Sequence, residues 1–241
     1  MKKLSVFICL ISLFFAGCAS TKIDVSTLDK IAIISIGGNS HLPWYEKVDG
    51  KEPSATQGIL SKSVDNILKD DDPEISEAFN RLDYAEDSFK KHVNEILSLN
   101  FVPKEDVIGS KRYRAMSEGL LHSLNTTITA KDYKDVRSPD KFNMRKMAQE
   151  IEANSFVVLN FEFFKKAVKG SKLNGEISPY IKMKVKLYNN LGKEIKNKTY
   201  VVQGTESVKS SGKNYDKEAL VAMYPAVIDQ LMTQFTLDFI Q

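Results

Sequence analysis

The chain has 241 residues, of which 42% are hydrophobic and 27% are charged. Its 34 basic residues nearly balance its 31 acidic residues, which excludes the strongly basic composition typical of nucleic-acid-binding proteins. This length and apolar content suffice for one sizeable hydrophobic core, and the sequence contains neither an internal repeat nor a low-complexity tract.

The first 17 residues are organised as a secretory signal peptide. Lys2 and Lys3 provide a positive start, and an almost wholly apolar run extends over Leu4–Phe15. This run is shorter than the ~20 apolar residues that a membrane-spanning helix requires, and no second run in the chain approaches that length. We therefore expect residues 1–17 to be a cleaved leader.

The leader ends in Ala16-Gly17-Cys18, which resembles the lipobox of bacterial lipoproteins, with Phe15 in place of the usual leucine. That resemblance implies cleavage before Cys18 and attachment of acyl chains, such as palmitate, to this lipidation site. Cys9 leaves with the leader, so lipidation also accounts for a mature chain with a single thiol and no disulfide. We expect residues 18–29 to be a lipidated tether that holds the body at a membrane.

The residues after the cysteine indicate a location. Ala19 and Ser20 occupy the next two positions, so no aspartate follows the cysteine. By the sorting rule of enterobacterial lipoproteins, this implies the outer membrane of the cell envelope, with the body facing the periplasm.

The body begins with a strand and continues with helices. Lys30–Ile36 is a nearly continuous β-branched run, which predicts a strand buried on both faces. Residues 39–58 are loop-like, and apolar residues over 59–68 then recur at helical spacing. The apolar stripe of Ile75–Leu97 then predicts a long helix, with Asp72 as its N-cap and Pro73 in its first turn. Phe101–Gly109 predicts a short second strand and turn.

The second half of the body contains further helices and strands. Its predicted elements are a helix over 113–124, a helix over 142–153, an apolar strand over 156–164, a polar connection over 165–176, and a hairpin of strands 181–187 and 194–203. Asp216 is expected to cap a final helix that Pro225 kinks. This order predicts an α/β (α+β) fold as a single domain over residues 30–241, with a mixed sheet of about four to five strands and helices mainly on one face.

Four segments of this body resemble periplasmic lipoproteins whose domain is similar to the amino-terminal domain of TolB. That group includes the curli secretion lipoprotein CsgG and lipoprotein activators of penicillin-binding proteins. The segments are Lys30–Ile36, Phe101-Val102-Pro103 with Val107 and Tyr113, Ala148–Leu159, and Leu187–Lys193. Within the third segment, Glu152-Ala153-Asn154 stands where the group usually has Gly-Ala-Asp. The matched segments are structural, and none is catalytic.

Common enzyme and metal-binding motifs do not occur in the sequence. It has no GxxxxGK[ST] phosphate loop, no HExxH and no GxSxG. Asp70-Asp71-Asp72 with Glu74 lacks the spacing and the glycine of a calcium-binding loop, and helix capping explains Asp72 without a metal. We therefore predict no catalytic residue, no metal and no cofactor, and we identify no small-molecule substrate.

A row of lysines is one candidate for contact with a partner. Lys182, Lys184 and Lys186 alternate along one strand and share a face, with Lys196 and Lys198 expected close by. Such a row could meet lipid headgroups or an anionic wall polymer. It could equally be a solvated sheet face, whose lysines deter edge-to-edge aggregation.

An aromatic pair is the second candidate. Trp44, the only tryptophan, and Tyr45 lie in a loop directly after a proline. Trp and Tyr are enriched at binding hot spots, so the pair could anchor a partner. The same bulk would be favourable if the rings packed back onto the sheet.

Three functions compete. The leading hypothesis is a membrane-anchored periplasmic lipoprotein that serves as a non-enzymatic interaction or scaffolding module of an envelope protein complex. One alternative is a subunit of a CsgG-like outer-membrane secretion pore. The other is a hydrolase of envelope polymers, which would need a nucleophile or paired carboxylates in a cleft.

Overall fold

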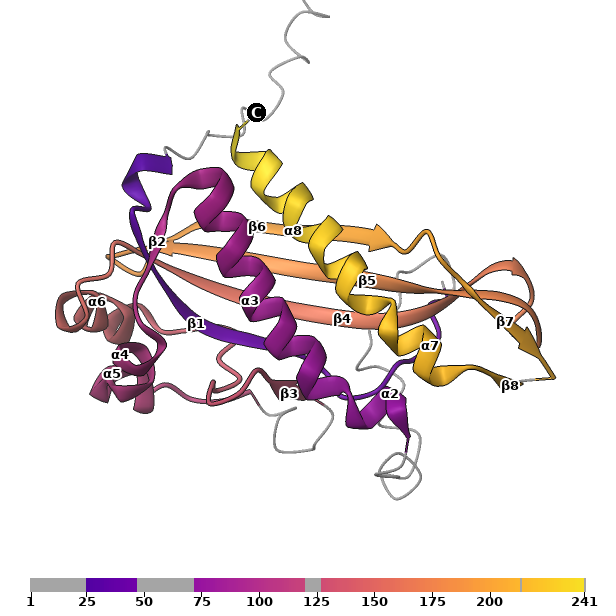
Figure 1. Cartoon of the computed structure of the whole chain (residues 1–241). Coiled ribbons are helices and arrows are strands. Elements are labelled where there is room, and N and C mark those ends of the chain that lie inside the picture. The colour runs from indigo at the N-terminus through magenta and orange to yellow at the C-terminus, as the bar shows by residue number, and fades with distance from the viewer. Residues whose placement is uncertain (1–24, 47–71, 120–126, 213, 241) are drawn as a thin grey trace, which may run out of the picture.

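The computed structural model describes residues 25–46, 72–119, 127–212 and 214–240 (Figure 1). The predicted leader and the lipidation site Cys18 lie outside these residues, as do 47–71, which include most of the loop-like segment and the helix predicted over 59–68. The described chain has a mixed α/β fold, as the sequence predicts. Its sheet contains eight strands, compared with the four to five expected.

The sheet is built around β1 (Lys30–Asn39), which is buried from Ile31 to its end and follows the short 3-10 helix η2 (Val25–Thr27). Continuous β-branched residues suit a strand with both faces covered, so this prediction is confirmed. β1 pairs in parallel with β4 (Ser155–Gly170) and β2 (Asn100–Phe101), and antiparallel with β3 (Thr127–Thr129).

A long antiparallel pair forms the other half of the sheet. β4 runs beside β5 (Asn174–Asn189) from Ser155↔Asn189 to Gly170↔Gly175. The first part of β5 also pairs with β7 (Val208–Ser211), which pairs with β8 (Asn214–Tyr215). The second part of β5 pairs with β6 (Glu194–Gln203). The expected polar connection over 165–176 is therefore wrong, because β4 and β5 continue through it as a projecting arm (Figure 1).

Two long helices, α3 (Ala78–Leu97) and α8 (Tyr224–Ile240), lie side by side across one face of the sheet (Figure 1). Phe89 of α3 contacts Phe235 of α8, with 5.4 Å between ring centroids. Gly38 allows this close packing, since a Cβ there would lie 3.2 Å from Leu82 of α3 and 3.1 Å from Phe163. The predicted arrangement of helices mainly on one face is confirmed.

The predicted caps are confirmed. Asp72 accepts a hydrogen bond from Glu74 N and starts α2 (Pro73–Ser76), which is separate from α3. Asp216 caps α7 (Lys217–Ala222) through Ala219 N. The final helix breaks at Met223, and Pro225 lies in the first turn of α8, where its missing N–H costs little.

Three short helices, α4 (Lys104–Gly109), α5 (Lys111–Arg114) and α6 (Lys141–Glu150), gather at the end of the sheet where β1 begins (Figure 1). The expected strand and turn over 101–109 is therefore only partly right, because 104–109 is helical. The helix expected over 113–124 ends at Arg114, and 120–126 lie outside the described residues. No helix among the described residues is both long and apolar enough to cross a membrane.

Candidate functional site

The segment Pro43–Tyr45 runs beside β4 as a short additional strand. Tyr45 N donates to the carbonyl oxygen of Lys165 at 2.9 Å, and Lys165 N donates to the carbonyl oxygen of Pro43 at 3.0 Å. Successive side chains of a strand point to opposite faces, so the two aromatic residues separate. Trp44 lies on the face that carries the helices, and Tyr45 lies on the other face.

Trp44 is half-buried at the end of the sheet. Its ring lies edge-on to that of Tyr215, with 6.4 Å between centroids. The ammonium groups of Lys165 and Lys172 lie 5.5 Å and 5.4 Å from the Trp44 ring centroid. Trp44 thus packs back onto the sheet beside two cations, and its contact with a partner stays a prediction.

Lys165 and Glu74 form a buried ion pair beneath Trp44. The Lys165 Nζ lies 2.9 Å and 2.8 Å from the two carboxylate oxygens of Glu74 and 2.7 Å from the Tyr215 hydroxyl. Tyr215 in turn donates to Glu74. Burial lowers the pKa of Lys165, and the Glu74 carboxylate opposes that shift. Burial and the hydrogen bond to Glu74 raise the pKa of the Tyr215 phenol.

Arg81 of α3 completes this group, which we call the buried charge cluster: Glu74, Arg81, Lys165 and Tyr215. The Arg81 side chain is 3% exposed and lies 5.3 Å and 5.5 Å from the ring centroids of Phe163 and Tyr224. Its Nη2 donates to Glu74 O at 2.9 Å, whereas Nε and Nη1 have no hydrogen-bond partner among the described residues. The cluster joins α2, α3, β4 and β8. Its charged side chains therefore have a structural role, because they connect these four elements.

On the opposite face, Tyr45 covers the sheet. Its ring lies 4.1 Å from that of Tyr180, and the ammonium of Lys182 lies 5.4 Å from the Tyr45 centroid and 5.5 Å from that of Phe164. Phe164 is fully buried, and Lys182 is 9% exposed. The structure therefore brings together two of the predicted contact residues, Tyr45 and Lys182.

The three lysines of the row lie in different environments. Lys184 is exposed, whereas Lys186 donates to Arg137 O at 2.9 Å and to the Ser138 hydroxyl at 3.2 Å. The expected proximity of Lys196 and Lys198 is wrong. Both lie on the helix-covered face and pair with Asp238 of α8.

A β-bulge explains this error. The register of β5 and β6 shifts between Leu187 and Tyr188, so that Lys196 lies opposite Leu187 and not beside Lys186. A one-residue shift moves every following side chain to the other face of the sheet. The carboxylate of Asp238 then receives hydrogen bonds from both lysines and from Tyr200.

The residues exposed on the face of β5 and β6 opposite the helices form what we call the uncovered face: Lys184, Asn197, Thr199, Val201 and Gln203. Val201 is 41% exposed, although it is a large hydrophobic residue in a strand. The Tyr45–Tyr180–Lys182 group borders this face through the pairs Tyr180↔Gln203 and Lys182↔Val201. A sheet face with an exposed apolar residue and a packed aromatic border is suited to contact with another macromolecule.

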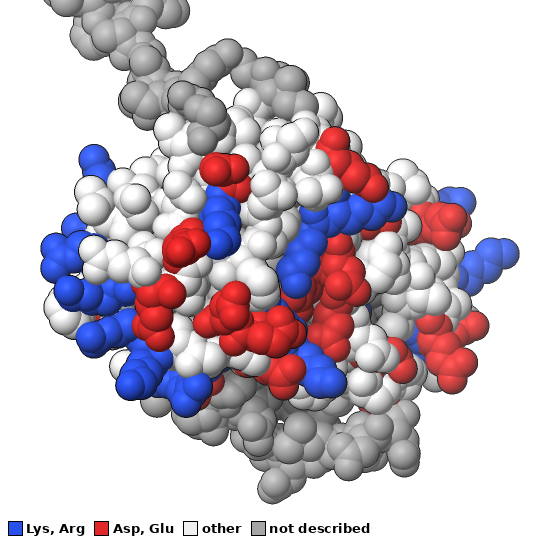
Figure 2. Space-filling model, turned by 60° about the vertical axis from the view of Figure 1, so that its left-hand side comes forward, with Lys and Arg blue, Asp and Glu red and all other residues white. Residues whose placement is uncertain are grey.

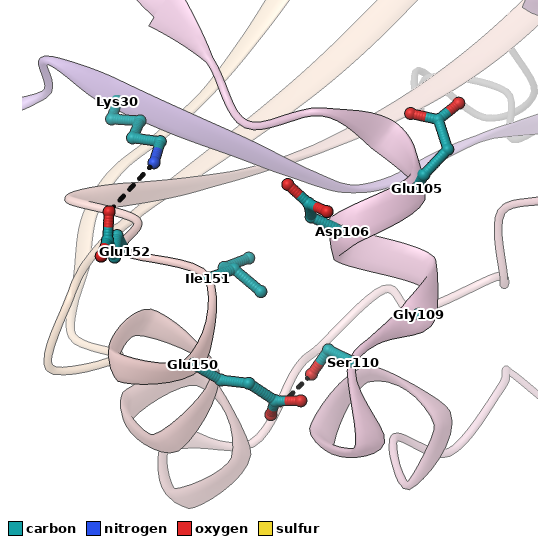
Figure 3. Close-up of a pocket in the computed structure, with 8 residues that line it drawn as sticks. All are labelled: Lys30, Glu105, Asp106, Gly109, Ser110, Glu150, Ile151 and Glu152. Atoms are coloured by element: carbon teal, nitrogen blue, oxygen red, sulfur yellow. Dashed lines mark hydrogen bonds and ion pairs between the residues drawn. The ribbon is translucent and has the colours of Figure 1, made fainter.

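An acidic hollow of about 430 Å³ opens at the other end of the molecule, between β1, α4 and the end of α6 (Figure 3). Asp106 and Ile151 point into it. Glu152 pairs with Lys30 at 3.6 Å, and Glu150 accepts from the Ser110 hydroxyl at 3.0 Å. Its lining residues are Lys30, Glu105, Asp106, Gly109, Ser110, Glu150, Ile151 and Glu152.

Sequence reasoning missed this hollow because its walls come from three distant segments, none of which carries a motif. Its chemistry suits a cationic group more than an anion. No set of three or more His, Cys, Asp or Glu side chains in the described part of the chain is arranged to hold a metal ion.

No protein-family model matches the chain, and no curated protein matches it. Among solved structures, the C-terminal domain of LpoB from Salmonella enterica is similar to 73% of this chain over 83% of its own length, with 8% identity and a TM-score of 0.33. Lipoprotein GNA1162 from Neisseria meningitidis is similar to 84% of this chain over 95% of its own length, with 13% identity and a TM-score of 0.28. At these sequence identities and TM-scores, the similarity does not assign a function to this chain.

Proposed function

We propose that the protein is a lipid-anchored, non-enzymatic interaction module of the cell envelope, which holds a partner protein in the periplasm. The anchor is supported by the lipobox-like Ala16-Gly17-Cys18 at the end of an apolar leader. The proposed location is the outer membrane, by the residues that follow Cys18. The resemblance to lipoproteins with a TolB-like domain supports the same role.

The observation that carries the interaction role is the uncovered face of β5 and β6. Its exposed Val201 and Thr199 lie on β6 opposite Lys182 and Lys184 of β5, and Tyr45 packs against Lys182. Interfaces combine an apolar or aromatic centre with a polar rim, and this face has both. We propose Tyr45, Lys182, Lys184 and Lys186 as its contact residues, with Trp44 holding the Pro43–Tyr45 segment in place.

A catalytic role is not needed to explain the buried titratable groups. Perturbed pKa values in a cleft are typical of active sites, but structural ion pairs produce them as well. In the buried charge cluster, Lys165 and Tyr215 both bond to Glu74, and Trp44 covers them. These groups hold elements of the fold together, so their perturbed pKa values do not point to a catalytic site.

The contact face is tested by photo-crosslinking in intact cells. A photoreactive amino acid at Lys184 should give one crosslinked species of defined mass. The same group at Phe79 should not, because Phe79 is 55% exposed on α3 over the other face of the sheet. Tyr45→Ala should weaken the crosslink at 184. Equal crosslinking at both positions, or none at 184, would contradict the proposed face.

The anchor is tested separately by labelling cells with palmitate. The wild-type chain should take up the label and fractionate with membranes, because two or more acyl chains hold a protein firmly there. Cys18→Ser should remain unlabelled and leave the membrane fraction. Label on the Cys18→Ser variant would show that the lipid is attached elsewhere.

A further inference from the structure

The most exposed large hydrophobic side chain of the described residues is Leu191, at 62%, in the turn between β5 and β6. Phe142, in the first turn of α6, is 53% exposed. The two belong to one surface, because a Cβ on Gly192 would lie 2.9 Å from the Cα of Lys141. The turn therefore packs directly against the start of α6.

Basic side chains outnumber acidic ones near these two apolar residues, where Asp140 and Glu194 are the neighbouring exposed carboxylates. Arg112 of α5 lies over the Phe142 ring, with 5.4 Å from its guanidinium carbon to the ring centroid. We call the whole group the basic end patch; it contains Phe142 and Leu191 with Lys111, Arg112, Arg114, Lys141, Arg145, Lys146 and Lys193. All of these lysines and arginines are exposed except Arg112, which is half-buried.

Figure 2 shows Lys and Arg gathered along one side of this end of the molecule, with the acidic residues nearer the middle of the view. The acidic hollow adjoins the basic end patch, because Glu150, which lines it, accepts from Lys111 N at 3.2 Å. An anionic surface would be attracted to the basic side, and the hollow would limit contact to that side.

The tether leaves from the same end of the sheet. Ile31 at the start of β1 pairs with Ser155, which pairs with Asn189, two residues before Leu191. Two strand spacings separate Ile31 from Asn189, which is about 10 Å. Cys18 precedes the first described residue, Val25, by seven residues, so the tether can extend at most about 25 Å.

We propose that the basic end patch docks on the anionic lipid surface of the membrane that holds the anchor. Phe142 and Leu191 enter the headgroup layer, and the surrounding lysines and arginines pair with lipid phosphates. Exposed apolar residues among basic ones bind anionic bilayers by these two effects together. This inference rests on the proposed lipid anchor at Cys18, and it directs the buried charge cluster and the arm away from the membrane.

The experiment uses the full chain purified from membranes and reconstituted into vesicles. A single new cysteine is labelled with an environment-sensitive fluorophore, because the mature chain has no other free thiol once Cys18 is acylated. Leu191→Cys reports on the patch. Leu173→Cys is the matched control, since Leu173 is 46% exposed between β4 and β5 at the tip of the arm.

On vesicles that contain phosphatidylglycerol, the probe at 191 should shift to the blue and be quenched by a lipid-borne quencher. The probe at 173 should not respond, and neither probe should respond on pure phosphatidylcholine. Arg145→Glu with Lys146→Glu should reduce the response at 191 on the order of tenfold, given the contribution of each basic residue near an anionic surface. High salt should have the same effect.

Three outcomes would overturn the docking: a probe at 191 that stays in water on anionic vesicles, an equal response at 173, or an equal response at 191 to a soluble polyanion without vesicles. The last outcome would assign the patch to a polymer. If Cys18 carries no lipid, the proposed anchor fails, yet the Leu191→Cys chain with Cys9 and Cys18 replaced by serine, labelled and mixed with anionic vesicles, still tests the patch. The two proposals can therefore fail independently.

Discussion

At the end of the sheet where β1 finishes, the charges of Glu74, Arg81 and Lys165 are buried and held within the protein. At the end where β1 begins, the lysines and arginines of α5 and α6 are exposed around Phe142 and Leu191. Burial makes the first group sensitive to the loss of one partner. Because the second group is exposed, it contributes little to the free energy of folding, and its side chains can contact another molecule or a membrane.

Changes at the buried end should therefore report on stability, and changes at the exposed end on binding. Breaking a buried pair leaves an uncompensated charge in a low-dielectric interior, so its effect appears in the free energy of unfolding. Changing an exposed lysine or arginine alters that free energy by less than about 0.5 kcal/mol, so its effect should appear in association with membranes or partners.

The largest effect is expected from Glu74→Gln. The change leaves the ammonium of Lys165 buried without its counter-ion, which should lower the free energy of unfolding by about 3–5 kcal/mol in urea denaturation at neutral pH. Burial already lowers the pKa of Lys165, so the folded variant releases its proton more easily than the unfolded chain. The deficit should therefore shrink as pH rises.

The double variant Glu74→Gln with Lys165→Met removes the unpaired ammonium and should recover the part of the loss that it causes, while Arg81 keeps its hydrogen bond to Glu74 O. Glu176→Gln, in the arm of β4 and β5, is the matched control. Its pair with Lys169 is 3.3 Å long and largely exposed, so it should cost less than about 1 kcal/mol. A similar cost for both single variants would mean that burial does not distinguish these two ion pairs.

A smaller effect is expected from packing. Gly38→Ala places a methyl group 3.1 Å from Phe163 and 3.2 Å from Leu82, which should cost about 1–3 kcal/mol by overpacking. Gly109→Ala, at the other end of the sheet, meets nothing within 4 Å and should be neutral or slightly stabilising in the same urea measurement. Equal losses at both glycines would contradict the close approach of α3 to β1.

Local patterns predicted many single elements correctly. The double burial of β1 follows from its β-branched run, and the caps Asp72 and Asp216 follow from side-chain chemistry at helix starts. The continuation of β4 and β5 through 165–176 could not be predicted. Its many lysines are typical of a loop, and in the structure this part of β5 also pairs with β7, which is distant in the sequence. The helix at 104–109 was missed because Val107 and Ile108 favour a strand, whereas Pro103 and the acidic first turn start α4.

The candidate surfaces were only half predictable. Alternation along β5 correctly placed Lys182, Lys184 and Lys186 on one face. Nothing in that pattern indicated that Tyr45, from a distant segment, would cover Lys182. The bulge near Tyr188, the acidic hollow and the basic end patch all depend on which distant residues the fold brings together.

The smallest effect concerns Asp238 of α8, close to the anchored end. Burial alone would raise its pKa, but hydrogen bonds from Lys196, Lys198 and Tyr200 lower it to about 2. The unfolded chain, with the ordinary value of 3.8, then binds the proton more readily, so stability should fall as pH drops from about 4 to about 2. Asp238→Asn should remove that part of the pH dependence, at a cost below about 1 kcal/mol at neutral pH because water screens the group. Parallel urea midpoints for wild type and variant across this window would show that the lysine pairs do not stabilise α8 on β6.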